Sequence, residues 1–180
     1  MISEELINRC RNDDRKAHHE LYKLCFGILM SVCIRYRKNQ DDAAELMNTG
    51  FLKVLRSLKT YRIDIPFDAW IRRIMINTII SDYHKNKKYK EKIDYNVQEF
   101  DRISKGADQN LGESNMQIEL IMNAMNHLPD TARKVLNLYV FEGFTHDEIS
   151  GKLGISQGTS KWHLHEARKK LQVFLKKLSV

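Results

Sequence analysis

Side chains that can form directed hydrogen bonds are concentrated in a short stretch near the end of the chain. Lysine and arginine can bond the edge of guanine, glutamine can bond that of adenine, and hydroxyl or backbone amide groups can anchor phosphates. These groups occur together with two imidazoles between residues 157 and 169: Gln157, Gly158, Thr159, Ser160, Lys161, His163, His165, Arg168 and Lys169. The mixture indicates reversible recognition of nucleic acid rather than the making or breaking of covalent bonds.

The surrounding residues predict two helices joined by a tight turn over residues 145–178. Thr145 can cap the first helix, and Glu148, three residues later, can close a capping box. Gly154 can adopt the left-handed conformation that ends a helix, and Ser156 can cap the next one. This is the spacing of a helix-turn-helix, whose second helix can enter a major groove of DNA. A plain helical hairpin is the alternative.

Two residues of the second helix fit DNA recognition less simply. Glu166 would repel phosphates, although it can accept a hydrogen bond from cytosine or pair with Lys169 or Lys170. Trp162 can either anchor the helix in the core or face DNA, and its position slightly favours packing. The opposite face of this helix is apolar: Leu164, Ala167 and Leu171.

The composition limits the class of protein. The 180 residues carry a formal net charge of +7, which favours a polyanionic partner, and a hydrophobic fraction of 42% argues against a disordered chain. No apolar run resembles a signal peptide or reaches membrane-spanning length, so we expect a cytoplasmic protein without membrane insertion. Three cysteines are an odd number, so reduced, buried thiols are expected rather than a disulfide framework.

Apolar residues recur at helical spacing on both sides of one polar segment. That segment, residues 92–115, is rich in Asp, Glu, Gly, Asn and Ser and is typical of a flexible linker. We therefore predict an all-α protein with two small helical domains joined by this linker. The N-terminal domain is a helical bundle over residues 1–91, and the C-terminal four-helix domain over residues 116–180 contains the helix-turn-helix.

Within the N-terminal bundle the sequence predicts a helix break near residues 12–14, a helix that runs to about Lys59, and another that begins near Pro66. The last helix ends in a basic, aromatic-rich run over residues 83–90. Such a run can suit single-stranded nucleic acid, where backbone charge and base stacking both contribute. A solvated helix end is the other interpretation.

Motifs for catalysis are not evident in this sequence. It contains neither a glycine-rich phosphate loop nor a His-Glu-x-x-His pattern. His163 and His165 lie two residues apart on a helix and therefore point in different directions, which is poor geometry for a metal, and the adjacent His18 and His19 share this problem. We expect no enzyme activity, metal or cofactor.

Three blocks of the sequence resemble the extracytoplasmic-function group of bacterial RNA polymerase sigma factors. Residues 42–55 look like the helix by which that family docks on the polymerase. Residues 67–77 are similar to the helix that opens the downstream (−10) promoter element, and residues 128–171 to the domain that reads the upstream (−35) element. In this chain Asn48-Thr49 stands where members often have Gln-Glu, and Glu166 stands where many have Arg.

The resemblance implies roles for individual residues. Glu45, Leu46, Asn48 and Phe51 would lie on or under the surface that docks the coiled coil of the polymerase β′ subunit. The loop over residues 61–66 would capture a base flipped from the non-template strand, and the donor residues between 157 and 169 would read the −35 element. The implied −10 contacts are Tyr61, Arg62, Phe67, Trp70, Arg73, Asn77, Tyr83 and Lys87.

The family's mechanism implies binding partners rather than substrates. Core RNA polymerase (β′ and β subunits) and promoter DNA are expected, and an anti-sigma factor is a further partner that the family suggests. Two other functions remain open from the residues alone. A stand-alone helix-turn-helix regulator would bind duplex DNA without polymerase, and a nucleic-acid enzyme would need an acidic metal cluster that the sequence does not display.

Overall fold

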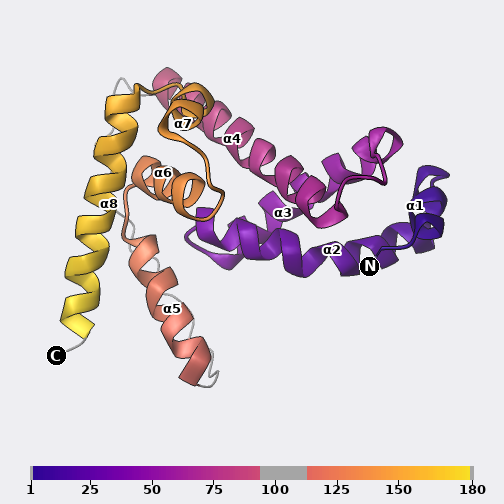
Figure 1. Ribbon diagram of the computed structural model, residues 1–180, viewed down its shortest axis with the longest axis horizontal. Helices are drawn as coiled ribbons and strands as arrows, with labels where there is room; N and C mark the ends of the chain where they lie inside the picture. The colour runs from indigo at the N-terminus through magenta and orange to yellow at the C-terminus, as the bar shows by residue number, and fades with distance from the viewer. Residues whose placement is uncertain (1, 94–112, 179–180) are drawn as a thin grey trace. The chain divides into compact units, whose positions relative to one another are not determined.

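The computed structural model describes residues 2–93 and 113–178, with the side chains at 87–93, 113–119, 177 and 178 left undescribed. Every regular element in this part of the chain is helical, which confirms the all-α prediction (Figure 1). The first half contains α1 (Glu4–Arg11), α2 (Arg15–Tyr36), α3 (Gln40–Ser57), the 3₁₀ turn η1 (Leu58–Thr60) and α4 (Phe67–Ile93). The second half contains α5 (Glu113–Asn126), α6 (Asp130–Val140), α7 (His146–Leu153) and α8 (Gln157–Leu178).

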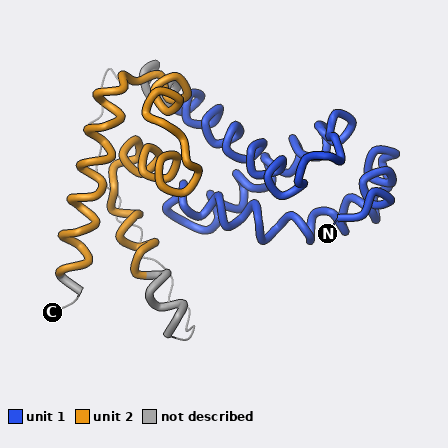
Figure 2. Tube along the Cα trace, in the orientation of Figure 1, with its two compact units in different colours: residues 1–97 blue, residues 98–180 orange. Residues whose placement is uncertain are grey.

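The helices form two compact units, unit 1 over residues 1–97 and unit 2 over residues 98–180 (Figure 2). Helix α4 continues to Ile93 and α5 begins at Glu113, so helix occupies both ends of the predicted linker. Residues 94–112 of that linker lie outside the described residues. Among the described helices, none combines the length and the apolar character needed to cross a bilayer.

In unit 1, helices α2, α3 and α4 pack against one another, and α1 packs on α2 and η1. The break after α1 arises where Asp14 caps α2 by accepting hydrogen bonds from the backbone N–H groups of Lys16 and Ala17. Arg11 ties α1 to the following elements, because its guanidinium donates to the carbonyl oxygens of Leu58 and Tyr61 at 3.0 and 2.8 Å. Fully buried side chains fill the space between the helices: Leu21, Leu29, Val32, Met47, Val54, Ile71 and Met75.

A glycine and a thioether set the close approach of α3 and α4. A Cβ atom added at Gly50 would overlap the sulfur of Met75, so only a residue without a side chain fits there unless Met75 moves. Met75 also lies 3.6 Å, sulfur to sulfur, from Cys33. All three cysteines are buried free thiols, and burial raises the pKa of Cys25 and Cys33 to about 12, so these two stay protonated and inert at neutral pH.

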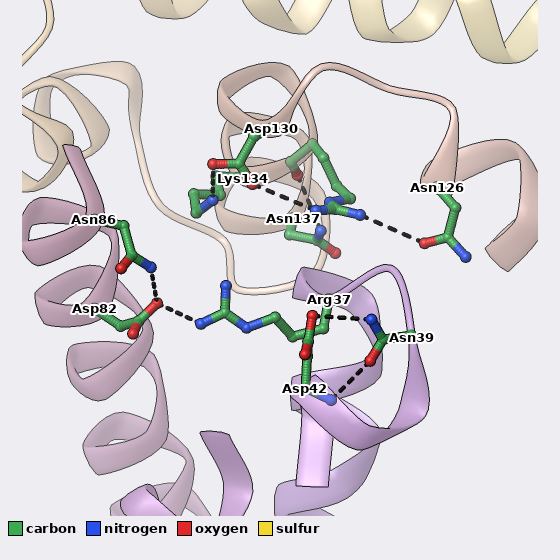
Figure 3. Close-up of polar contacts among 10 residues, drawn as sticks. Arg37, Asn39, Asp42, Asp82, Asn86, Asn126, Asp130, Lys134 and Asn137 are labelled. Carbon is green, nitrogen blue, oxygen red and sulfur yellow. Dashed lines mark hydrogen bonds and ion pairs between the residues drawn. The ribbon is translucent and has the colours of Figure 1, made fainter. Parts of the chain in front are cut away.

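A polar contact fastens the end of α2 to the middle of α4. Figure 3 shows Arg37, just after α2, paired with Asp82 of α4, and Asn86 one turn later donating to the same carboxylate at 3.0 Å. In the same region Asn39 caps α3 by accepting a hydrogen bond from the Asp42 backbone N–H at 2.7 Å. The Arg37–Asp82 pair joins α4 to the end of α2, and the Asn39 cap fixes the start of α3.

In unit 2, α8 packs against α5, α6 and α7. Pro129 precedes α6, and Asp130 in its first turn pairs with Lys134 and Arg133 (Figure 3). Burial would raise the pKa of Asp130, but these two cations outweigh burial and hold that pKa below its ordinary value. The buried apolar side chains come from all four helices and from the turn between α5 and α6: Met125, Leu128, Val135, Leu138, Ile149, Leu153, Leu164 and Ala167.

Candidate nucleic-acid interface

The turn between α7 and α8 has the predicted helix-turn-helix geometry. Thr145 accepts a hydrogen bond from the Glu148 backbone N–H, and the Glu148 carboxylate accepts one from the Thr145 backbone N–H, so the capping box is complete. Gly154 ends α7 in the left-handed conformation, with φ of 63°. Ser156 then caps α8 through the Thr159 backbone N–H at 3.0 Å. These local contacts fix the direction in which α8 leaves the turn.

Most of the predicted upstream contacts lie on the accessible side of α8. The side-chain amide of Gln157 donates a hydrogen bond to the Asp147 carboxylate at 2.5 Å, and this bond ties the first turn of α8 to α7. His163 is half-buried, and burial lowers its pKa below the ordinary histidine value. The exposed members of the set are Gln157, Gly158, Thr159, Lys161, His165, Arg168 and Lys169.

Ser160 is an exception and corrects the sequence prediction. Its side chain is fully buried, because Ser160 falls on the same helical face as the core residues Leu164 and Ala167. Its hydroxyl lies 2.9 Å from Nδ1 of His146, the first residue of α7. Ser160 therefore joins the two helices of the motif and does not present its hydroxyl to a ligand.

Sequence reasoning also missed the aromatic contacts around His146. Its imidazole stacks on the ring of Tyr139 in α6, with centroids 4.7 Å apart and planes at 25°. The guanidinium of Arg168 in α8 lies 5.7 Å from the centroid of the same Tyr139 ring. His146 thus contacts α6 and α8 at once. No local pattern indicates this, since 14 residues separate His146 from Ser160 in the sequence.

The stability of unit 2 is expected to fall as the pH drops below about 6.5, the ordinary histidine pKa. Burial, followed by the positive charges of Lys161 and Arg168, lowers the pKa of folded His146, so the unfolded chain binds more protons in this range. Replacing His146 with Gln should make this loss of stability with falling pH shallower. The contribution of His163 to the loss should remain. Hydrogen exchange of α7 and α8 amides at several pH values measures this unit separately. An unchanged pH slope in the variant would contradict the assignment.

Trp162 does not anchor α8 in the core, the alternative that its position slightly favoured, since its side chain is 59% exposed. Its indole meets the imidazole of His163 edge to face, with centroids 4.9 Å apart. Glu166, one turn later, is half-buried and lines a groove of about 350 Å³ between α5 and α8 together with Lys169 and Lys170. The outward side of α8 therefore includes a large aromatic surface as well as donor groups.

The loop after η1 is built around three packed rings. Tyr61 meets Phe67 at 5.2 Å and Trp70 at 4.7 Å between centroids, and its hydroxyl donates to the Ile65 carbonyl oxygen at 2.6 Å. Burial, followed by the nearby charge of Asp64, raises the pKa of Tyr61, so it remains a neutral donor. This cluster shapes the loop from beneath and leaves Trp70 half-buried at its edge.

The predicted downstream contacts divide into supporting and accessible residues. Tyr61, Phe67 and Tyr83 are buried, with exposed fractions of 7%, 9% and 9%, so these rings support the surface instead of forming it. Arg62, Arg73 and Asn77 are exposed, and Arg62 pairs with Asp64 in the loop at 2.9 Å. Trp70, Arg73 and Asn77 are three and four residues apart and so share one face of α4. The side chain of Lys87 lies outside the described residues.

The predicted docking residues of α3 show the same division. Glu45 and Asn48 are exposed, whereas Leu46 and Phe51 are 5% and 6% exposed and lie under the surface. The Tyr22 hydroxyl of α2 donates to the Asn48 side-chain oxygen at 3.1 Å. Apolar side chains that sequence reasoning missed remain exposed on the same two helices: Leu24, Phe26 and Leu52, at 50%, 42% and 54%.

Each unit matches a known domain family. Residues 21–89 of unit 1 match Sigma-70 region 2, and residues 118–171 of unit 2 match Sigma-70, region 4. The chain is similar to RNA polymerase sigma factor SigV of Bacillus subtilis, with 27% identity over 175 residues that cover 97% of this chain and 94% of the relative. It is also similar to the ECF RNA polymerase sigma-E factor of Escherichia coli, with 22% identity and coverage of 93% and 91%.

The fold is also that of a solved sigma factor. The structure of the sigma factor RpoE from Bartonella quintana, determined in complex with the anti-sigma factor NepR, matches with a TM-score of 0.52 and 22% identity. The match covers 88% of this chain and 96% of that one. Two sigma-70 domains in this order, together with relatives similar along nearly their whole length, show that the chain belongs to the extracytoplasmic-function group of RNA polymerase sigma factors.

Proposed function

We propose that this sigma factor joins core RNA polymerase through unit 1 and contacts a promoter at two places, one with each unit. Unit 1 would open the −10 element and unit 2 would read the −35 element. The observation that carries the proposal is the pairing of two different surfaces in one chain. One is the cationic outer side of a helix-turn-helix, and the other is an exposed arginine and asparagine beside an aromatic-lined loop.

The proposed docking surface consists of Tyr22 and Phe26 of α2 with Glu45, Asn48 and Leu52 of α3. The rings of Tyr22 and Phe26 are 5.9 Å apart, and the Tyr22 hydroxyl bonds Asn48, so the two helices present one continuous surface. Exposed apolar side chains gathered in this way are typical of a protein-binding site. The coiled coil of the polymerase β′ subunit is the proposed partner, and Leu46 and Phe51 support this surface from beneath.

The downstream contact would be made by Trp70, Arg73 and Asn77 on α4, with the loop over residues 61–66. Unpairing and flipping a base costs a few kcal/mol, and contacts to the extruded base and its strand can offset that cost. Trp70 offers a ring edge for stacking, Arg73 a charge for the phosphate backbone, and Asn77 an amide for hydrogen bonds. The buried rings of Tyr61 and Phe67 would keep this loop in one conformation before DNA arrives.

The upstream contact would be made by residues 157–169 of α8 in the major groove. Gln157, Lys161 and Arg168 can reach base edges, while Thr159, Lys169 and the Gly158 backbone amide can hold phosphates. His163 and His165 add imidazoles to the same stretch. Ser160 and His146 would act indirectly, since their bond sets how α8 is held against α7.

Partners and location follow from this mechanism. The polymerase and the chromosome are in the bacterial cytoplasm, so the protein would act there. An anti-sigma factor is a further proposed partner, supported by the complex in which the similar Bartonella quintana structure was determined. Sigma factors work by binding, and we propose neither a catalytic residue nor a cofactor for this chain.

A binding experiment distinguishes this function from that of a stand-alone regulator. Mixed with core polymerase and passed through a sizing column, the chain should elute with the enzyme. Charge reversal at Glu45 combined with Leu52→Arg should reduce that association by at least tenfold, whereas Lys16→Glu on an exposed part of α2 should leave it intact. Tight, specific binding of the free chain to duplex DNA, with no affinity for polymerase, would instead support the regulator.

A further inference from the structure

The direction in which Trp162 points follows from the residues around it on α8. Ser160, Leu164 and Ala167 are buried and define the face that packs on the rest of unit 2. At 100° of rotation per residue, Trp162 lies about 170° from the centre of that face. It therefore occupies the middle of the outward side, and its 59% exposure agrees with this position.

The immediate surroundings leave the indole of Trp162 accessible. Gly158 precedes it by one turn on the same side of the helix and contributes no side chain to cover it. The ring of His163 touches the indole edge to face, which supports it from one side. A large apolar surface is thus held outward on the helix that enters the groove.

The charges beside Trp162 favour duplex DNA over a protein partner. Lys161 precedes Trp162 in the sequence and is exposed, and the exposed Lys169 follows two turns later on the same side of α8. Glu166, one turn after Trp162, is the nearby carboxylate, and it is half-buried toward the groove between α5 and α8. An apolar group with two exposed lysines on the same helix suits a surface that offers both phosphates and an apolar feature.

We propose that Trp162 is a specificity-determining residue that packs against a thymine 5-methyl group in the upstream promoter element. In the major groove thymine alone among the four bases presents a methyl group, and apolar side chains read it by contact. The inference rests on the proposed function of unit 2, and it goes further by naming the base and the chemical group that the helix reads. It predicts that at least one thymine is preferred in the upstream element.

The test uses the chain assembled with core polymerase on a promoter that it initiates from. Thymines of the upstream element are replaced one at a time by uracil, which removes the methyl group and keeps base pairing. At one or two positions the wild-type holoenzyme should bind roughly fourfold more weakly, the effect of exposing one buried methyl group. Holoenzyme with Trp162→Ala should bind the thymine promoter more weakly and lose the sensitivity to uracil. Holoenzyme with Trp162→Phe should keep part of the sensitivity to uracil.

The outcomes separate this inference from the proposed function. If wild-type holoenzyme initiates at the promoter but tolerates uracil everywhere, or prefers upstream elements without thymine, the role of Trp162 is overturned while the sigma function stands. Equal sensitivity to uracil in wild type and Trp162→Ala also overturns it. If Trp162→Ala loses association with core polymerase, Trp162 belongs to a protein interface and the proposal is wrong.

Discussion

Replacing Lys161 and Arg168 together with alanine is expected to weaken upstream-element binding by the holoenzyme roughly 10- to 100-fold. Both side chains are exposed on α8, the second helix of the helix-turn-helix. Because cations displace counterions from DNA, the variant should also show a salt dependence shallower by about one to two in log–log slope. Equilibrium binding to an upstream duplex over a range of salt concentrations measures both effects.

The matched control is Lys170→Ala with Lys176→Ala, which removes two charges from the same helix. Lys170 faces sideways toward the groove beside α5, and Lys176 lies five turns from the start of α8. This control should retain affinity to within about threefold, since a general loss of charge acts weakly at a distance in salt. Equal losses in the two double variants would show that α8 attracts DNA only by its net charge.

Replacing Trp70 with alanine is expected to slow promoter opening by roughly 5- to 150-fold, the effect of one lost aromatic–base stack. Trp70 is half-buried at the edge of the ring cluster with Tyr61 and Phe67, so its exposed part can meet an unstacked base. The rate of open-complex formation, followed by permanganate reactivity of the −10 strand, measures the change. The Trp70→Phe variant should lose much less of the rate of open-complex formation.

A template that already contains an unpaired −10 region separates opening from other defects. On it the Trp70→Ala holoenzyme should initiate nearly as well as wild type, because the cost of unpairing has been removed. Association with core polymerase should be unchanged, since Trp70 lies outside the docking surface on α2 and α3. An equal defect on the unpaired template would mean that Trp70 maintains the fold of the loop and does not take part in opening.

Local signals predicted the helix-turn-helix well. The capping box of Thr145 and Glu148 and the left-handed Gly154 each depend on residues at most four apart, so the sequence contains the information that determines them. The break between α1 and α2 was predicted for the same reason, since Asp14 caps the next helix with its own side chain. Packing that joins distant residues has no such signal. The hydrogen bonds from Arg11 to Leu58 and Tyr61 span about 50 residues and emerge only from the fold.

Residue type alone did not predict which of the candidate side chains are exposed. Ser160 was expected to face a ligand because serine is polar, yet helical phase places it with Leu164 in the core and His146 satisfies its hydroxyl. For Trp162 a core position and an outward position were both open, with packing slightly favoured, and helical phase places it outward. In both cases the angular position on α8 determines whether the side chain is buried or exposed.

Sequencing the 5′ ends of RNA made by the reconstituted holoenzyme on bacterial genomic DNA tests the central claim most directly. The two-contact mechanism predicts discrete start sites that are absent with core polymerase alone. These starts should share two short sequence elements at a nearly constant separation, the upstream one lost with Lys161→Ala and Arg168→Ala and the downstream one dependent on Trp70. Start sites identical to those of core polymerase, or start sites that share no element, would contradict it.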